Sequence, residues 1–168
     1  MSDEVTQFCR AQYPRLVGML DLMCGDLALA EELAQETLAR VWTNWRKVST
    51  YESPSGWTTR VAVNLANSHF RRRRAERRAH SRVAGGVSTV AIDPDTANTV
   101  ALRAAVTELP PRMRTAVVLR YFLDLPFAEV AQAMDAPETT VRSLVHRALK
   151  RLRGDFDRSE EQEATHVR

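Results

Sequence analysis

Apolar residues recur every three or four positions through most of the first half of the chain, which predicts three amphipathic helices. The first covers residues 3–23, the second runs from about 27 to 48, and the third from Trp57 to about Ala79. Residues 49–56, STYESPSG, have the composition of a loop between the last two. The apolar side of the second helix is predicted to consist of Leu29, Leu33, Leu38, Val41, Trp42 and Trp45.

Residues 81–96 interrupt this periodicity and contain Gly-Gly and Asp-Pro-Asp, so they are predicted to form a flexible linker between two small helical domains. The domains are residues 1–80 and 97–153, and the fold class is all-α. After the linker, one helix ends near Leu109 and another runs from 112 to about 123. The side of the latter helix that is expected to pack under the last two helices consists of Met113, Ala116, Val117, Leu119, Arg120 and Phe122.

Residues 125–153 have the pattern of a helix-turn-helix, because a short apolar helix is followed by a turn of about three residues and a longer basic helix. Pro137 cannot continue the first helix but suits the first turn of the second. The buried stripe of the second helix is predicted to be Val141, Leu144, Val145, Ala148, Leu149 and Leu152. The residues left to face outward are Arg142, Ser143, His146, Arg147, Lys150 and Arg151.

Long cations mixed with a hydroxyl and an imidazole suit a helix that reads base edges, since arginine can bind guanine and serine can bond either edge type. The alternative is a plain helical hairpin inside a bundle. The charge distribution favours nucleic acid: residues 60–82 carry eight arginines against one acidic residue, Glu76, and residues 101–153 are also net positive. The first 59 residues are net negative and suggest a different partner. Residues 154–168 form a polar, acidic tail that is predicted to be disordered.

The third helix continues into a run of cations, Arg71–Arg74, that also favours nucleic acid over a merely solvated face. Asparagine can be bidentate to adenine, and aromatic rings can stack on unpaired bases. Its outward side is predicted to hold Thr58, Arg60, Asn64, Asn67 and Ser68.

Enzyme chemistry is not expected. Glu32 and Glu36 place two carboxylates on one helix face, but no matching histidine or carboxylate cluster accompanies them. Cys9 and Cys24 match no zinc spacing and are interpreted as small buried residues of a reduced, cytoplasmic protein. Neither a cofactor nor a metal is predicted, and no apolar run suggests a signal peptide or membrane insertion.

Four stretches, in order, resemble the extracytoplasmic-function (ECF) group of bacterial RNA polymerase sigma factors. AEELAQETLARVW at 30–42 is similar to the family's core-polymerase-binding helix, and W-x-x-R-V-A-V-N at 57–64 to its promoter-melting helix. A-V-x-E-L-P-P-R-x-R-x-x-V-V-L-R-Y at 105–121 is similar to the beginning of its C-terminal domain, and T-V-R-S-L-V-H-R-A-L-K-R-L at 140–152 to its recognition helix.

The resemblance implies a subunit that binds core RNA polymerase and directs initiation by reading −10 and −35 promoter elements. The largest-subunit clamp coiled coil would be bound by Glu32, Gln35, Glu36 and Arg40. The −10 element would be read and melted by loop 48–56, which takes a flipped base, and by Trp57, Arg60, Asn64, Asn67, Ser68, Arg71, Arg72, Arg73 and Arg74. The −35 element would be read by Arg142, Ser143, His146, Arg147 and Lys150. The family also implies an anti-sigma factor as a possible partner.

The chain departs from the family pattern at several positions. Pro126 and Pro137 stand where serine or threonine caps are usual, and Asp135 replaces a turn glycine but can still enter the left-handed region. Leu144 replaces a basic residue, and Ser68 a common aspartate. Two alternatives stay open from the residues alone: a stand-alone helix-turn-helix regulator that uses only residues 101–153, and a purely protein-binding helical module.

Overall fold

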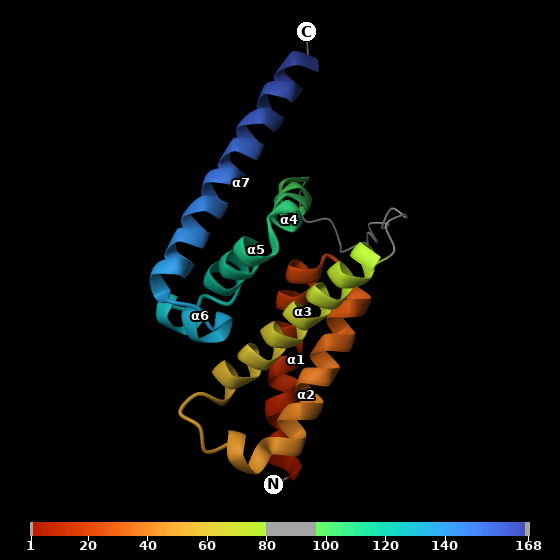
Figure 1. Cartoon of the computed structure of the whole chain (residues 1–168), viewed down its shortest axis with the longest axis vertical. Coiled ribbons are helices and arrows are strands. Elements are labelled where there is room, and N and C mark those ends of the chain that lie inside the picture. Colours follow the sequence, from red (N-terminus) through yellow and green to blue (C-terminus); the bar gives the residue numbers. More distant parts are fainter. Residues whose placement is uncertain (1, 80–96, 167–168) are drawn as a thin grey trace.

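The computed structural model describes residues 2–79 and 97–166, with side-chain surroundings over residues 3–76 and 100–154. Every regular element in these ranges is helical, as predicted (Figure 1). Residues 81–96, the predicted linker, lie outside the described residues. Within the described ranges, no helix combines the length and apolarity needed to cross a membrane.

The N-terminal domain consists of α1 (Ser2–Cys24), α2 (Leu27–Val48) and α3 (Pro54–Ala79). Gly25 and Asp26 form the junction between α1 and α2: Gly25 has a φ of +69°, and the Asp26 carboxylate accepts a hydrogen bond from the backbone N–H of Leu29 at 3.2 Å. The helix α1 is continuous through Pro14.

The helix α3 begins at Pro54, three residues earlier than predicted. The hydroxyl of Ser53 accepts a hydrogen bond from the N–H of Gly56 at 3.0 Å, and proline at the first helical position needs no donor partner. The loop between α2 and α3 is therefore shorter than residues 49–56, because residues 54–56 belong to the first turn of α3.

The C-terminal domain contains α4 (Ala97–Glu108), α5 (Pro111–Val117), the π-helical segment η1 (Val118–Phe122), α6 (Phe127–Met134) and α7 (Glu138–His166). The helices α6 and α7 form the predicted helix-turn-helix. Asp135 in its turn adopts the left-handed conformation, with φ 49° and ψ 52°, which confirms that an aspartate serves where glycine is usual.

The helix predicted over 112–123 changes at Val118 from α-helical to π-helical turns. A π-turn holds more residues than an α-turn and so rotates the side chains that follow it. For this reason the prediction that Phe122 packs under the helix-turn-helix is wrong. Its ring is 48% exposed and lies against Gly18 of α1, where an added Cβ would be only 2.7 Å from the ring.

The prediction that the acidic tail is disordered is wrong, because α7 continues through the tail to His166. Residues 155–166 include several good helix formers such as glutamate, glutamine, alanine and arginine, and they contain no proline. The single Gly154 is tolerated within a helix that the packed first half already nucleates.

One buried apolar cluster joins the two domains, which pack side by side in Figure 1. It combines Met19 and Leu20 of α1 and Ala62 of α3 with Leu119 of η1 and Val130 of α6. The helix α6 packs on α3, whereas α4 and η1 pack on α1. A second, smaller cluster at the far end of the N-terminal domain is formed by Val5, Val41, Trp45 and Val48.

Candidate nucleic-acid and polymerase surfaces

The outward face of α7 is exposed in the way the sequence predicts. Its buried side consists of Val141, Leu144, Val145, Ala148 and Leu152, with Leu149 half-buried. The five candidate −35 residues, Arg142, Ser143, His146, Arg147 and Lys150, are all exposed. Leu144 is buried, so its replacement of a usual basic residue adds to the core of the domain.

Two of these arginines have partners within the domain. The guanidinium of Arg142 lies 2.6 Å from the carboxylate of Glu138 and 4.3 Å above the ring of Phe127. The Nε of Arg147 donates to the Ser143 carbonyl at 3.2 Å. Both contacts pre-orient the guanidinium groups, but the Glu138 carboxylate offsets the charge of Arg142.

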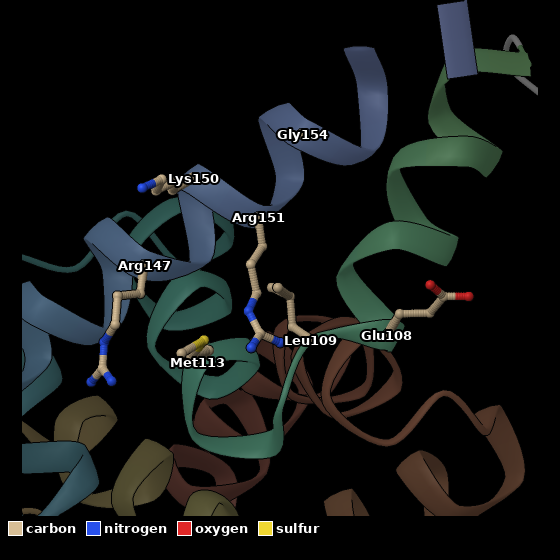
Figure 2. A pocket seen from close by; sticks show the side chains of 7 residues that line it. All are labelled: Glu108, Leu109, Met113, Arg147, Lys150, Arg151 and Gly154. Carbon is tan, nitrogen blue, oxygen red and sulfur yellow. The ribbon is translucent and has the colours of Figure 1, made fainter. Parts of the chain in front are cut away.

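A hollow of about 640 Å³ lies between α7 and the junction of α4 with α5. Figure 2 shows that Arg151 points from α7 toward Leu109 at this junction, whereas Lys150 points away from it. Arg151 is exposed, as the sequence pattern predicts, and it borders this hollow together with Arg147, one turn earlier on α7. The middle of the outward face is occupied by His146 and Lys150, four residues apart on the helix.

On α3, Arg60 and Asn64 are exposed, and so are Arg71–Arg74. The predicted outward residues Asn67 and Ser68 are half-buried, and the Ser68 hydroxyl accepts a hydrogen bond from Arg71 at 3.1 Å. The prediction that Thr58 faces outward is wrong. Its side chain is fully buried, and its hydroxyl donates to the Pro54 carbonyl at 2.8 Å, which satisfies the group within the first turn of α3.

The loop before α3 borders a groove of about 620 Å³. The rings of Trp57 and Tyr51 stack at a tilt with centroids 6.3 Å apart and form one wall. The other wall belongs to the C-terminal domain, with Leu125, Glu129, Gln132 and Ala133. The candidate base-binding loop thus faces α6.

The four candidate polymerase-binding residues of α2, Glu32, Gln35, Glu36 and Arg40, are exposed on one face. The Glu36 carboxylate and the Arg40 guanidinium are 2.9 Å apart. Trp42 was predicted to be buried, and this is wrong: 52% of it is exposed, whereas Trp45 is buried against Phe8. Trp42 and Gln35, seven residues apart, share a side of α2, so the sequence reasoning missed an aromatic group on this surface.

Buried polar contacts fasten the two domains. Arg114 of α5 donates to the carbonyls of Met23 at the end of α1 and of Leu109 at 2.8 and 3.0 Å, and also to that of Thr107. Asp21 of α1, itself buried, pairs with Arg103 of α4. Arg15 donates to the Leu123 carbonyl at 3.0 Å.

Desolvation changes the titration of two groups at this contact. Burial lowers the pKa of Arg114, opposed by the nearby Cys24. Burial raises the pKa of the Cys24 thiol to about 12, although Arg114 acts in the opposite direction. Both Cys24 and Cys9 are half-buried and unpaired. No three histidine, cysteine or carboxylate side chains gather as a metal site in the part of the chain that the structure describes.

Comparison with known proteins places both domains in one family. Residues 8–76 match the model of sigma-70 region 2, and residues 99–152 match that of sigma-70 region 4. The ECF RNA polymerase sigma factor SigW of Bacillus subtilis is 27% identical over 146 residues, which cover 78% of this chain and 77% of SigW. The RNA polymerase sigma-E factor of Streptomyces coelicolor is 27% identical over 91% of this chain and 86% of its own length. SigI of Mycobacterium tuberculosis is longer, and the chain spans 54% of it.

Two solved structures share the fold. The sigma factor RpoE, crystallised with the anti-sigma factor NepR from Bartonella quintana, matches with a TM-score of 0.80 and 19% identity over 92% of this chain and 97% of RpoE. CnrH in complex with the cytosolic domain of CnrY matches with a TM-score of 0.65 and 17% identity over 94% and 90% of the two chains. Since region 2 accounts for most of residues 1–80, a stand-alone regulator built on the C-terminal domain is not supported. The chain belongs to the ECF group of sigma-70-type RNA polymerase sigma factors, which direct promoter-specific transcription initiation.

Proposed function

We propose that the outward face of α7 reads the −35 element from the major groove. The observation that carries this proposal is the exposure of all five candidate residues above a fully apolar buried stripe. Arginine can bind guanine through two hydrogen bonds, and the remaining cations hold phosphates. Because Glu138 already holds Arg142, Arg147 carries more of the base reading than Arg142 in this chain.

The −10 element is read and opened by the N-terminal domain. The Tyr51–Trp57 pair offers aromatic rings beside the loop for a flipped base, and Arg60 and Asn64 follow one turn apart on the exposed side of α3. Arg71–Arg74 hold backbone phosphates. The half-burial of Asn67 and Ser68 gives these two residues a smaller share of direct base contact.

Core RNA polymerase binds the exposed face of α2. Glu32, Gln35, Glu36 and Arg40 are accessible there, and the acidic pair suits a basic coiled coil on the clamp of the largest subunit. Trp42 joins this surface as an exposed aromatic group, the residue type most often found at the centre of protein interfaces. An anti-sigma factor is a further partner by analogy with RpoE, which was solved in complex with the anti-sigma factor NepR.

The replacement Arg147→Ala is expected to weaken −35-dependent initiation about tenfold, because a bidentate base contact contributes about 1–3 kcal/mol. Run-off transcription with core enzyme on a promoter that the wild-type protein uses measures the effect. Arg151→Ala is the matched control: it removes the same charge one turn further along α7, from an exposed residue that borders the same hollow as Arg147 (Figure 2) but is not a candidate −35 residue, and a smaller loss is expected. Equal losses in the two variants would show that α7 contributes only general charge.

The replacement Asn64→Ala is expected to reduce promoter opening about tenfold, because removing a carboxamide that reads an exposed base costs about 1–3 kcal/mol of discrimination. Permanganate reactivity of unpaired thymines in the polymerase–promoter complex reports the open fraction. Asn44→Ala serves as control, because Asn44 is an exposed asparagine on α2 whose amide donates to the Arg40 carbonyl at 2.8 Å. Normal opening by Asn64→Ala would remove this residue from the −10 surface.

A further inference from the structure

The candidate −10 loop is covered by the chain's own C-terminal domain. The helix α6 supplies one wall of the groove whose other wall is the Tyr51–Trp57 pair. A smaller cavity of about 190 Å³ beside it is likewise lined by both domains. A base flipped toward Trp57 would meet Leu125, which precedes α6, and Glu129 and Gln132 of α6.

The surface that covers the loop carries negative charge, the same sign as the phosphates of DNA. Asp135, in the helix-turn-helix turn, places a carboxylate oxygen 3.5 Å from the guanidinium of Arg60. Glu129 lines the groove next to the loop. Arg60 therefore cannot pair with a phosphate and with Asp135 at full strength at the same time, and the Glu129 carboxylate repels a strand that approaches the loop.

The energy that holds this cover in place comes from elsewhere in the domain contact. The Arg60–Asp135 pair is exposed, and such pairs contribute little. The pair of buried Asp21 with half-buried Arg103, the half-buried hydrogen bond from Arg114 to Met23 and the buried apolar cluster shared by both domains are better shielded from solvent. Removing one partner of a buried ion pair leaves an uncompensated charge, which is strongly unfavourable.

In the closed arrangement the two domains also lie too close together to contact both promoter elements at once. Elements named −10 and −35 lie about 25 base pairs apart, which is about 85 Å of B-form DNA. In the closed chain the turn of the helix-turn-helix touches α3 itself, through Asp135 and Arg60. Residues 80–96 join the domains and can extend over at most about 60 Å. This length and the dimensions of the two domains together allow separated domains to reach both promoter elements.

We propose that in the free chain the C-terminal domain acts as an autoinhibitory cover, in which α6 and its acidic residues occupy the −10 surface until the Asp21–Arg103 contact is broken. This inference rests on the proposed role of the loop and α3 in binding the opened −10 strand. Within the described residues α7 packs mainly on α4, α5 and α6, so its exposed outward face stays available to duplex DNA in the closed chain.

The test uses the full chain with the replacement Arg103→Glu, which sets a second carboxylate against buried Asp21. Fluorescence anisotropy with a labelled pool of short, random-sequence single strands is expected to show affinity at least about tenfold higher than for the control, because apparent affinity scales with the fraction of binding-competent chain. Affinity for random-sequence duplex is expected to equal that of the control. The control is Arg112→Glu, which makes the same charge change at an exposed residue of the same domain.

Opening is measured separately through Cys24, in a Cys9→Ser background. A maleimide is expected to label Cys24 at least about tenfold faster in Arg103→Glu, since exposure of the thiol restores an ordinary thiolate fraction. Faster labelling without tighter single-strand binding would overturn the cover. A wild-type labelling rate as fast as that of the variant would also overturn it, because the contact would then not persist in the free chain.

A second variant keeps the test independent of folding. Glu129→Gln combined with Asp135→Asn removes the acidic cover with side chains of the same size, and asparagine tolerates the left-handed conformation at 135. The double variant is also expected to bind single strands more tightly, with a smaller gain in affinity than Arg103→Glu. Unchanged binding by a folded double variant would show that the two carboxylates have no part in the cover. Run-off transcription by the wild-type protein with core enzyme separates failure of the proposed function from failure of the cover. If the wild-type protein directs no transcription, the proposed function is wrong. If it directs transcription but the variants bind single strands no more tightly than their controls, only the autoinhibitory cover is wrong.

Discussion

The replacement Trp42→Ala is expected to weaken binding to core RNA polymerase by about 2 kcal/mol, roughly 30-fold, while leaving the fold intact. The indole is half exposed, on the same side of α2 as Gln35 in the candidate polymerase surface. A large aromatic group in that position desolvates fully only when a partner binds. Titration of labelled protein with core enzyme gives the affinity, and thermal unfolding gives the stability.

Trp45→Ala provides the matched comparison, because the same substitution one turn away removes a buried ring. Trp45 is 6% exposed, and its centroid lies 5.0 Å from that of Phe8. We expect it to cost about 3–5 kcal/mol of unfolding free energy, as large-to-small changes in a core do. If Trp42→Ala lost stability and kept its affinity for polymerase, Trp42 would be a structural residue and the polymerase surface would have to be redrawn around the carboxylates.

The contrast between the two tryptophans shows where periodicity stops being informative. Spacing predicted the buried stripe of α7 well, because Val141, Leu144, Val145, Ala148 and Leu152 all fall within one narrow arc. Trp42 falls at the border of the apolar arc of α2. Its exposure depends on which arc of α2 the neighbouring helices cover, which a single-helix pattern does not contain.

The contact between the domains was beyond sequence reasoning for a related reason. Asp21 and Arg103 are 82 positions apart, and no local rule pairs them. The π-helical segment that turns Phe122 toward Gly18, and the positive φ of Asp124, arise where η1 meets α1 and α6. Such features follow from the packing of complete domains. The family resemblance could identify the three candidate surfaces, but it could not indicate that one of them, the −10 loop with α3, faces α6 of the other domain.

The replacement Leu119→Ala is expected to lower the free energy of unfolding by about 2–5 kcal/mol, because the side chain is fully buried and its removal leaves a cavity. Leu102→Ala is the matched control. It makes the same change at a residue of α4 that is 46% exposed, so an effect within about 0.5 kcal/mol is expected. Denaturant unfolding followed by far-ultraviolet circular dichroism measures both variants.

The same variant tests whether the two domains unfold as one unit. All three tryptophans, Trp42, Trp45 and Trp57, lie in the N-terminal domain, whereas Leu119 lies in the C-terminal domain. If the shared cluster couples the domains, a cavity at Leu119 shifts the tryptophan fluorescence transition as far as the circular dichroism transition. If the domains are independent, the fluorescence transition stays at its wild-type midpoint. Coincident shifts would mean that opening the cover costs part of the folding energy of the chain, so that polymerase and promoter must supply it on binding.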